Sequence, residues 1–338
     1  MTIKDLAIKT GYAVGTVSRA LNDHPNVSEK ARKAILQAAE ECGFELNQNA
    51  KQLKQQHSNT ILVIVKGNNN ELFSEMLEFI QPLFARTRYQ LAVDYNDEEE
   101  NEVLRAVQLC REKKPLGLLF LGGNSQNFAQ DFGKIDIPAV LVTNDASGLK
   151  FDNLSSVCTD DAAAAQCAME ILIALGHRKF AIIGGDRNNS DTSCLRYEGC
   201  QRAFRAHGID FDPEQDYQGV RYSYQDGYNA TQALLKAGRE FTAVFACADV
   251  MAIGAIRALW EAGKRVPEDV SVMGVDGLPL CSFLVPQLSG ISQSIQGMAN
   301  RAVEILLSGI EQGTGAGHET VPFGINRRES VRSIGEEE

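Results

Sequence analysis

Short apolar runs alternate with longer segments of helical spacing from residue 60 to residue 275. The apolar runs predict strands at 61–65, 91–95, 116–121, 138–143, 156–159, 180–183, 243–245 and 270–275. The intervening segments predict helices at 72–85, 99–112, 161–175, 194–206, 226–236 and 250–261. Such alternation is typical of βαβ units, which wind a parallel sheet. The elements form two similar sets, and we therefore expect an α/β protein with two doubly wound parallel-sheet lobes.

The loops after these predicted strands carry side chains that suit a small-molecule site. In open parallel sheets, ligands bind beyond the carboxyl ends of the strands, and in a two-lobed body those ends face a cleft. Four such side chains are Phe73, Arg196, Tyr222 and Asp276. Arginine offers a fork of donors and aspartate a pair of acceptors, which suits a ligand rich in hydroxyls or a carboxylate. For a lone arginine or aspartate near a strand end, a surface ion pair or a helix cap remains the alternative.

The amino-terminal segment predicts two short helices joined by a tight turn. Thr2 can cap the first helix together with Asp5, and Gly11 ends it. A second helix is predicted at 13–21, with Val17 spaced to face a core. Two short helices joined through a glycine turn make a helix-turn-helix, whose second helix can enter the DNA major groove. A plain structural hairpin fits the same spacing.

The residue types in and after this segment favour the DNA-binding interpretation. They include Asp5, Leu6, Ala7, Gly11, Thr16, Val17, Ser18, Arg19, Leu21 and Asn22, followed by Val27, Ser28, Arg32, Gly43, Phe44 and Asn47. This pattern closely resembles the headpiece of the LacI family of bacterial transcriptional regulators, which includes galactose- and purine-repressor types. Two departures, Leu46 in place of the usual proline and Val14-Gly15 in place of larger polar residues, bear on which operator is recognised.

A third helix is predicted at 29–42, and the polar segment 47–58 follows it. By itself, 47–58 fits a solvated linker. The resemblance implies a hinge helix, in which Leu53 matches the residue that wedges into the minor groove and Ala50 matches the small residue where two hinges pack. An isolated helix of this length is barely stable in water, so we expect it to form only when paired on DNA.

DNA contacts are expected from the exposed start of the second helix and from the hinge. Val14 offers an apolar contact to a thymine methyl, Thr16 offers a hydroxyl, and Arg19 can reach a base edge or a phosphate. The complete set of expected DNA-binding residues is Thr2, Val14, Gly15, Thr16, Ser18, Arg19, Asn22, Ala50 and Leu53. The expected partner is a palindromic double-stranded operator, bound by a homodimer, with a tetramer as the alternative.

The rest of the chain is similar to the periplasmic-binding-protein-like core of the same family. The resemblance implies a headpiece at 1–46, a hinge at 47–58, a first lobe at 59–160 plus 293–318, and a second lobe at 161–292 plus 319–338. Arg196 matches the family's Arg-x-x-Gly ligand arginine and Asp276 its Gly-x-Asp acidic ligand. Tyr222 and Phe73 match aromatic walls of the effector pocket in the second and first lobes. The resemblance thus implies a small-molecule effector, a sugar or sugar derivative, and no cofactor.

Two departures from the family pattern alter this expected pocket. Ala248 replaces a common asparagine, and Gly277 replaces an acidic or amide residue. The loss of these polar groups favours a ligand less hydroxylated than a simple hexose, or one bound in another pose. Asp249 is expected to start the following helix, where its carboxylate meets the positive N-terminus.

The formal net charge of −11 is distributed unevenly along the chain. Residues 1–58 contain eight Lys or Arg against six Asp or Glu, a net of +2, which leaves 25 against 38, a net of −13, for the rest. A mildly basic head is drawn to phosphates while an acidic body is repelled by them, as a DNA-reading protein requires. The eight cysteines form no C-x-x-C pair, which predicts free thiols, no metal site and a reducing cytoplasm.

Other functional classes find little support in the sequence. There is no G-x-x-x-x-G-K-[ST], G-x-G-x-x-G or G-x-S-x-G motif, and the five histidines are dispersed, so we expect no enzyme. No apolar signal segment precedes the first helix and no apolar run could span a membrane, so we expect a cytoplasmic protein. We therefore predict a ligand-responsive transcriptional regulator, most simply a repressor. A stand-alone solute-binding protein is the alternative.

Overall fold

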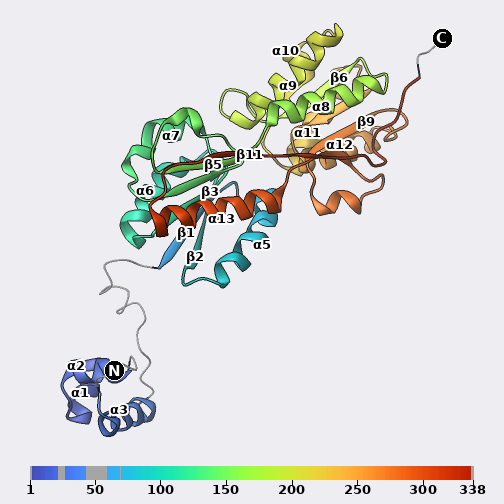
Figure 1. Cartoon of the computed structure of the whole chain (residues 1–338). Helices are drawn as coiled ribbons and strands as arrows, with labels where there is room; N and C mark the ends of the chain where they lie inside the picture. Colours follow the sequence, from blue (N-terminus) through green and yellow to red (C-terminus); the bar gives the residue numbers. More distant parts are fainter. Residues whose placement is uncertain (1, 22–26, 43–58, 69, 336–338) are drawn as a thin grey trace. The chain divides into compact units, whose positions relative to one another are not determined.

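The computed structural model describes residues 2–21, 27–42, 59–68 and 70–335, and the chain divides into two compact units, 1–58 and 59–338 (Figure 1). The first unit consists of α1 (Ile3–Thr10), α2 (Val14–Leu21) and α3 (Glu29–Glu41). Thr2 and Asp5 form a reciprocal capping box at the start of α1. Leu6, Val17 and Ile35 are fully buried in a small core. The predicted helix-turn-helix and third helix are confirmed.

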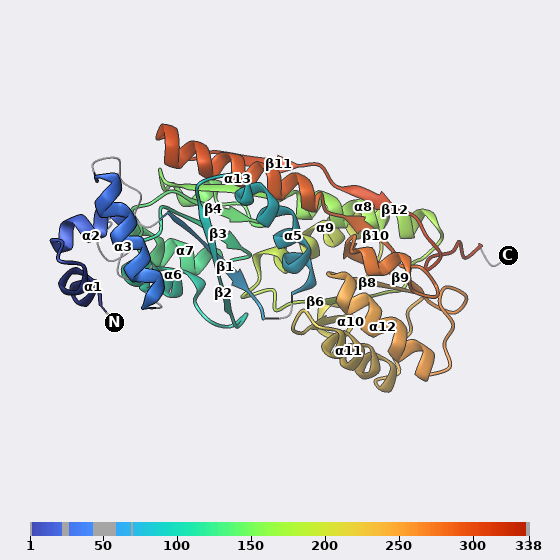
Figure 2. The same cartoon turned by 90° about the horizontal axis from the view of Figure 1, so that it is seen from below.

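The first sheet of the second unit is entirely parallel and has the order β11-β5-β4-β3-β1-β2. Its strands are β1 (Thr60–Lys66), β2 (Gln90–Asn96), β3 (Gly117–Leu121), β4 (Ala139–Val142), β5 (Leu154–Thr159) and β11 (His318–Val321). Side chains alternate across β1, so Ile61, Val63 and Val65 join one core and Leu62 and Ile64 the other. Helices α5 (Glu71–Ala85) and α13 (Ile295–Gln312) cover the first face, whereas α6 (Glu102–Lys113) and α7 (Ser125–Asp131) cover the second (Figure 2).

The second sheet has the order β12-β10-β9-β8-β6-β7, and only β12 is antiparallel to its neighbour. Its strands are β6 (Phe180–Gly184), β7 (Tyr217–Gly219), β8 (Ala243–Ala246), β9 (Ser271–Asp276), β10 (Ser289–Ser292) and β12 (Gly324–Asn326). Helices α8 (Asp161–Ala174) and α9 (Asp191–His207) pack on one face, and α11 (Tyr224–Lys236) and α12 (Asp249–Glu261) on the other. Short helices are α10 (Pro213–Asp216), η1 (Phe132–Lys134), η2 (Ser147–Leu149) and η3 (Pro279–Ser282). The predicted pair of doubly wound lobes is confirmed.

The chain passes between the two sheets after β5, after β10 and after β11. The last of these passages lies later than the expected boundary at residue 318, because β11 continues to Val321 and pairs with β5 along its whole length. The first lobe described below therefore includes all of β11, and β12 then joins the second sheet. Within the described ranges, no helix combines the length and the apolar character needed to cross a bilayer.

Candidate effector and DNA-binding sites

Arg196 is the centre of a buried ionic group in the second lobe. It lies on α9, is only 3% exposed, and its Nε donates to Asp161 Oδ1 at 2.7 Å. Its Nη1 donates to the carbonyl of Cys247, and its Nη2 lies 4.0 Å from Asp276 Oδ1. Because Asp161 starts α8, Cys247 follows β8 and Asp276 ends β9, the group gathers at the carboxyl ends of the strands. The structure thus brings Arg196 and Asp276 together, as expected for a shared polar site.

Asp276 is held by Gln293, which follows the neighbouring strand β10 and donates its backbone N to the Asp276 carbonyl at 3.0 Å. Gln293 donates its Nε2 to Asp276 Oδ1 at 2.7 Å and accepts from Thr159 Oγ1 at 3.2 Å. Burial raises the pKa of the Asp276 carboxyl, the Arg196 guanidinium opposes this, and the Asp249 carboxylate adds to it. Asp276 also has a φ of 126°, a strained conformation of the kind that collects at functional sites.

Asp249 is the first residue of α12, as predicted, and it also fixes the loop after Asp276. Its Oδ2 accepts backbone hydrogen bonds from Gly277 at 2.7 Å and from Leu278 at 2.8 Å. Burial raises the pKa of its carboxyl, although these two donors favour the charged form. Asp249 therefore fixes the backbone that follows Asp276.

The two expected aromatic residues lie in different surroundings. The Tyr222 hydroxyl and Ser193 Oγ are 2.5 Å apart, and burial raises the pKa of Tyr222 to about 12 although Arg196 opposes the shift. Tyr222 thus belongs to the neighbourhood of Arg196. Phe73 is only 5% exposed in the first-lobe core, where its ring packs against Gly122 so closely that a Cβ there would lie 2.7 Å from it. The structure does not bring Phe73 into contact with the Arg196 group.

Four residues of this site were missed in the sequence: Thr159, Asp161, Ser193 and Gln293. The sequence did carry a signal for two of them. Thr159 ends a predicted strand, and Asp161 starts a predicted helix. Gln293 follows the four-residue strand β10, which has no distinctive pattern, so its place beside Asp276 depends on the sheet order.

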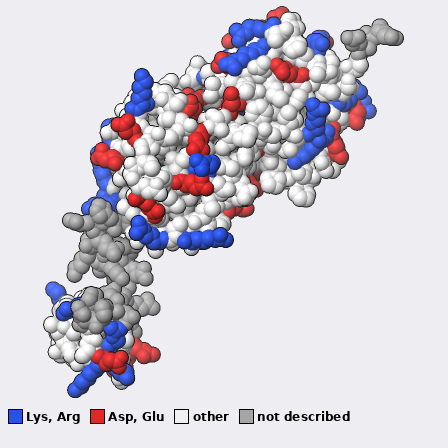
Figure 3. All heavy atoms as spheres, viewed as in Figure 1, with Lys and Arg blue, Asp and Glu red and all other residues white. Residues whose placement is uncertain are grey.

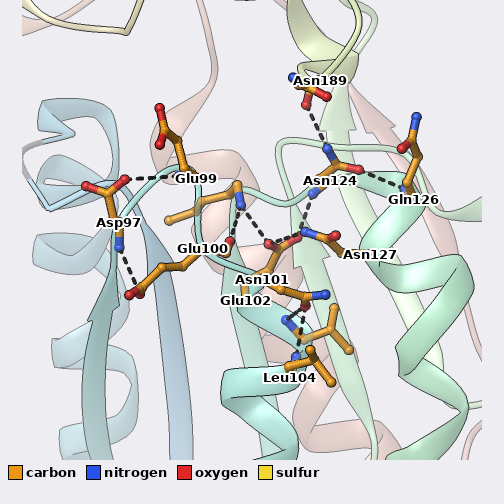
Figure 4. Close-up of polar contacts among 12 residues, drawn as sticks. Asp97, Glu99, Glu100, Asn101, Glu102, Leu104, Asn124, Gln126, Asn127 and Asn189 are labelled. Carbon is orange, nitrogen blue, oxygen red and sulfur yellow. Dashed lines mark hydrogen bonds and ion pairs between the residues drawn. The ribbon is translucent and has the colours of Figure 1, made fainter.

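A second polar network lies at the strand ends of the first lobe (Figure 4). The fully buried Glu102 accepts from Lys66 Nζ at 2.6 Å, from the backbone N of Asn124 at 2.6 Å and from Asn127 Nδ2 at 3.0 Å. Asn124 then reaches across to the second lobe, where its Nδ2 donates to the carbonyl of Asn189 at 2.8 Å. Glu102 therefore orients a loop that contacts the opposite lobe.

Further contacts join the two lobes at the same rim. Asp191 accepts from the backbone N of Ser125 at 2.7 Å and from its Oγ at 2.8 Å. Arg221 of the second lobe pairs with Asp97 at 2.6 Å and with Glu98 at 2.5 Å in the first. In addition to these side-chain contacts, the two lobes are joined by the three passages of the main chain. Separation of the lobes at this rim would therefore break these contacts.

The first unit presents the start of α2 on its surface. Val14 is 42% exposed, Gly15 and Arg19 are exposed, and Thr16 and Ser18 are half-buried. Arg19 Nε donates to the carbonyl of Gly15 at 3.1 Å, which holds the guanidinium along the helix. Thr2 is exposed and engaged in capping α1. The other expected DNA contacts, Asn22, Ala50 and Leu53, lie outside the described residues.

Charge is mixed on the face of the second unit seen in Figure 3, where acidic and basic side chains are interspersed among uncharged ones. The ion pairs of this unit include Arg202 with Glu198 at 2.7 Å and Arg301 with Glu319 at 2.6 Å. The visible face thus shows no single-sign area of the size that would attract a nucleic acid by charge alone.

Comparisons with known proteins agree with this architecture. Residues 2–47 match the family model described as bacterial regulatory proteins of the lacI family, and residues 169–331 match a periplasmic binding protein-like domain. The chain is 34% identical over 314 residues to the HTH-type transcriptional regulator MalR of Clostridium butyricum, covering 91% of this chain and 92% of that protein. It is 29% identical to the HTH-type transcriptional repressor PurR of Histophilus somni (strain 129Pt), covering 98% and 99%.

Solved structures give the same result over the whole chain. The lac repressor dimer bound to operator and the anti-inducer ONPF has a TM-score of 0.79 at 25% identity, with 98% of this chain and 99% of that chain covered. A complex of the transcriptional regulator CelR with cellobiose has a TM-score of 0.72 at 25% identity, with the same coverage. The relatives named here are transcriptional regulators and not enzymes. The chain therefore belongs to the LacI family of bacterial regulatory proteins and is a DNA-binding transcriptional regulator.

Proposed function

We propose that this regulator is a repressor whose operator affinity changes when a sugar or sugar derivative binds between the two lobes. The observation that carries the proposal is the buried group of Arg196, Asp161 and Asp276 at the carboxyl ends of the second sheet. A guanidinium and two carboxylates offer donors and acceptors in a buried site, which matches the hydroxyls of a saccharide. The cellobiose bound by the related CelR supports a ligand of this class.

The proposed DNA-binding form is a homodimer on a near-palindromic operator. Large apolar side chains are exposed on the second lobe, with Trp260 66%, Leu280 41%, Phe283 80% and Val285 95% accessible. Exposed apolar groups of this size mark association surfaces. A two-fold dimer uses the same patch on both copies and presents two reading helices to two half-sites. The dimeric state of the related lac repressor on its operator supports this assembly.

Asp276→Ala tests the proposed pocket in operator-binding titrations. The ligand is first chosen by a thermal-shift screen of sugars and nucleobases, because a ligand that binds only the folded state stabilises it. Truncation of a buried, hydrogen-bonded charge costs about 2–5 kcal/mol, so the variant should need about 30-fold more ligand, or still more, for the same response. Operator affinity without ligand should stay close to that of the wild type.

The matched control is Asp94→Ala, which removes a carboxylate that pairs with Arg105 at 2.8 Å within the first lobe. This control should respond to ligand as the wild type does. If Asp276→Ala responds at wild-type ligand concentrations, the effector binds somewhere other than beside Arg196.

A further inference from the structure

The second lobe has a hollow of about 480 Å³ that lies outside the group around Arg196. Helix α8 forms one wall, with Cys167 and Ile171, and the chain after β12 forms the other, with Val331. Arg327, Arg328 and Arg332 also line this second wall. Three arginine residues therefore border one concave surface of an otherwise acidic unit.

Two of these arginines, Arg327 and Arg332, differ from most other arginines of the second unit in their pairing. Within the described residues, neither Arg327 nor Arg332 forms an ion pair with a carboxylate. Arg328 is engaged inside the lobe, where its Nη1 donates to the carbonyl of Leu288 at 3.1 Å and its charge acts on the Asp249 carboxylate. In contrast, Arg202 and Arg301 each pair with glutamates on the protein surface. The exposed side chains of Arg327 and Arg332 can thus bind a partner from solution.

Local structural roles do not account for this cluster. The one carboxylate among the residues that line the hollow, Glu170, accepts from Gln166 Nε2 at 2.9 Å and forms no ion pair with these arginines within the described residues. The last carbonyls of α8 also have donors, since Ile173 accepts from Arg178 Nη1 at 2.8 Å and Leu175 accepts from the backbone N of Ile334 at 2.9 Å. The three arginines of the hollow are therefore not required to cap this helix.

We propose that the hollow binds an organic anion, with a phosphate or carboxylate head on the arginines and an apolar body against Ile171 and Val331. Guanidinium groups bind both kinds of oxyanion through paired, charge-assisted hydrogen bonds. The apolar side chains of Ile171 and Val331 would contact the apolar body of the ligand, as apolar side chains do in most small-molecule sites. The hollow is a second ligand site, separate from the effector site proposed between the lobes.

Cys167 provides a direct reporter of occupancy, because it is half-buried in the wall of the hollow and interacts electrostatically with both Glu170 and Arg327. The rate of its alkylation by iodoacetamide is measured by peptide mass spectrometry at constant ionic strength while phenyl phosphate is titrated. We expect saturable protection of Cys167, with inorganic phosphate and phenol protecting at least about tenfold more weakly because each supplies one half of the ligand. Benzoate replaces phenyl phosphate in a parallel titration, and the stronger protector identifies the head group.

The double variant Arg327→Gln/Arg332→Gln should raise the half-protecting concentration at least about tenfold, since charged hydrogen bonds to both side chains are lost. Both side chains are exposed, so the fold should tolerate the changes. Arg202→Gln/Arg301→Gln is the matched control with equal loss of charge, and the exposed Cys194 is the internal control. Absence of protection in the wild type, equal protection in the two double variants, or equal protection of Cys194 would each overturn the proposal. None of these results bears on the response measured with Asp276→Ala.

Discussion

At the scale of single residues, the charge balance around Arg196 makes stability depend on pH. One guanidinium faces two buried carboxylates, and Asp276 is the more distant, at 4.0 Å against 2.7 Å for Asp161. Burial raises the pKa of Asp276 in the folded protein above its value in the unfolded chain. The folded state then binds the proton more tightly, so this group adds stability as pH falls through the raised pKa and loses it as pH rises.

Asp276→Asn is expected to remove that dependence. The melting temperature of the variant relative to the wild type should increase from pH 5 to pH 8, because only the wild type must keep a buried charge at high pH. Between the pKa of Asp276 in the unfolded chain and its raised pKa in the folded protein, each pH unit changes the free energy of unfolding by about 1.4 kcal/mol. Calorimetric melts across this pH range measure the difference, and parallel curves for both proteins would show that Asp276 titrates normally. The pKa of Asp249 is also raised, so some slope should remain in the variant.

At the scale of helices, the starts of α7 and α9 meet across the two lobes. Ser125 donates twice to Asp191, and both residues are the first of their helices. Each hydrogen bond to a charged group contributes about 1.5–3 kcal/mol when buried, and less here because both residues are half-buried. Asp191→Ala should therefore shift the lobes toward separation and increase the radius of gyration of residues 59–338 in small-angle X-ray scattering.

Asp226→Ala is the control for this experiment, since Asp226 also lies in the first turn of a helix and pairs with a serine. Its partner Ser223 lies in the same lobe, with Ser223 Oγ donating to Asp226 at 2.5 Å. A change in lobe separation is expected only for Asp191→Ala. Equal scattering profiles for the wild type and Asp191→Ala would assign lobe closure to other contacts, of which Arg221 with Asp97 is the nearest candidate.

For the whole molecule, the proposed dimer determines whether two headpieces can engage one operator. Phe283→Glu should give monomers in sedimentation velocity at concentrations where the wild type is dimeric, because a two-fold interface would receive two new charges. Loss of the dimer should also weaken binding to a palindromic site, since each headpiece then binds without its partner. Ile325→Glu, which replaces another exposed apolar residue on β12, should leave the dimer intact. A dimeric Phe283→Glu variant would place the interface elsewhere.

Much of the architecture could be predicted from local sequence. The capping pattern of Thr2 and Asp5 and the αL glycine at residue 11 specify α1 and its turn through neighbouring residues alone. The apolar run of β1 specifies a strand buried on both faces. In contrast, the short strands β7, β10, β11 and β12 contain mostly polar residues and glycine, so no apolar run predicted them. The equally short β4 and β8 are wholly apolar and were predicted.

The site was predicted only in part because several of its contacts join residues that are distant in the sequence. Arg196 and Asp276 could be named because each lies in a recognisable motif, and Asp249 because it starts a helix. The pairing of Arg196 with Asp161, 35 positions earlier, and of Asp276 with Gln293, 17 positions later, depends on which strands lie side by side. No local signal carries that information.

The sequence alone therefore determined the helix-turn-helix, the alternation of strands and helices and the family, because each is encoded by residues close together in the chain. Only the tertiary structure decided that Phe73 lies in the first-lobe core, that Ser125 and Asp191 join the lobes, and that three arginines border a hollow beside Cys167. These relations depend on sheet order and on the passages between lobes, through which residues distant in sequence become neighbours.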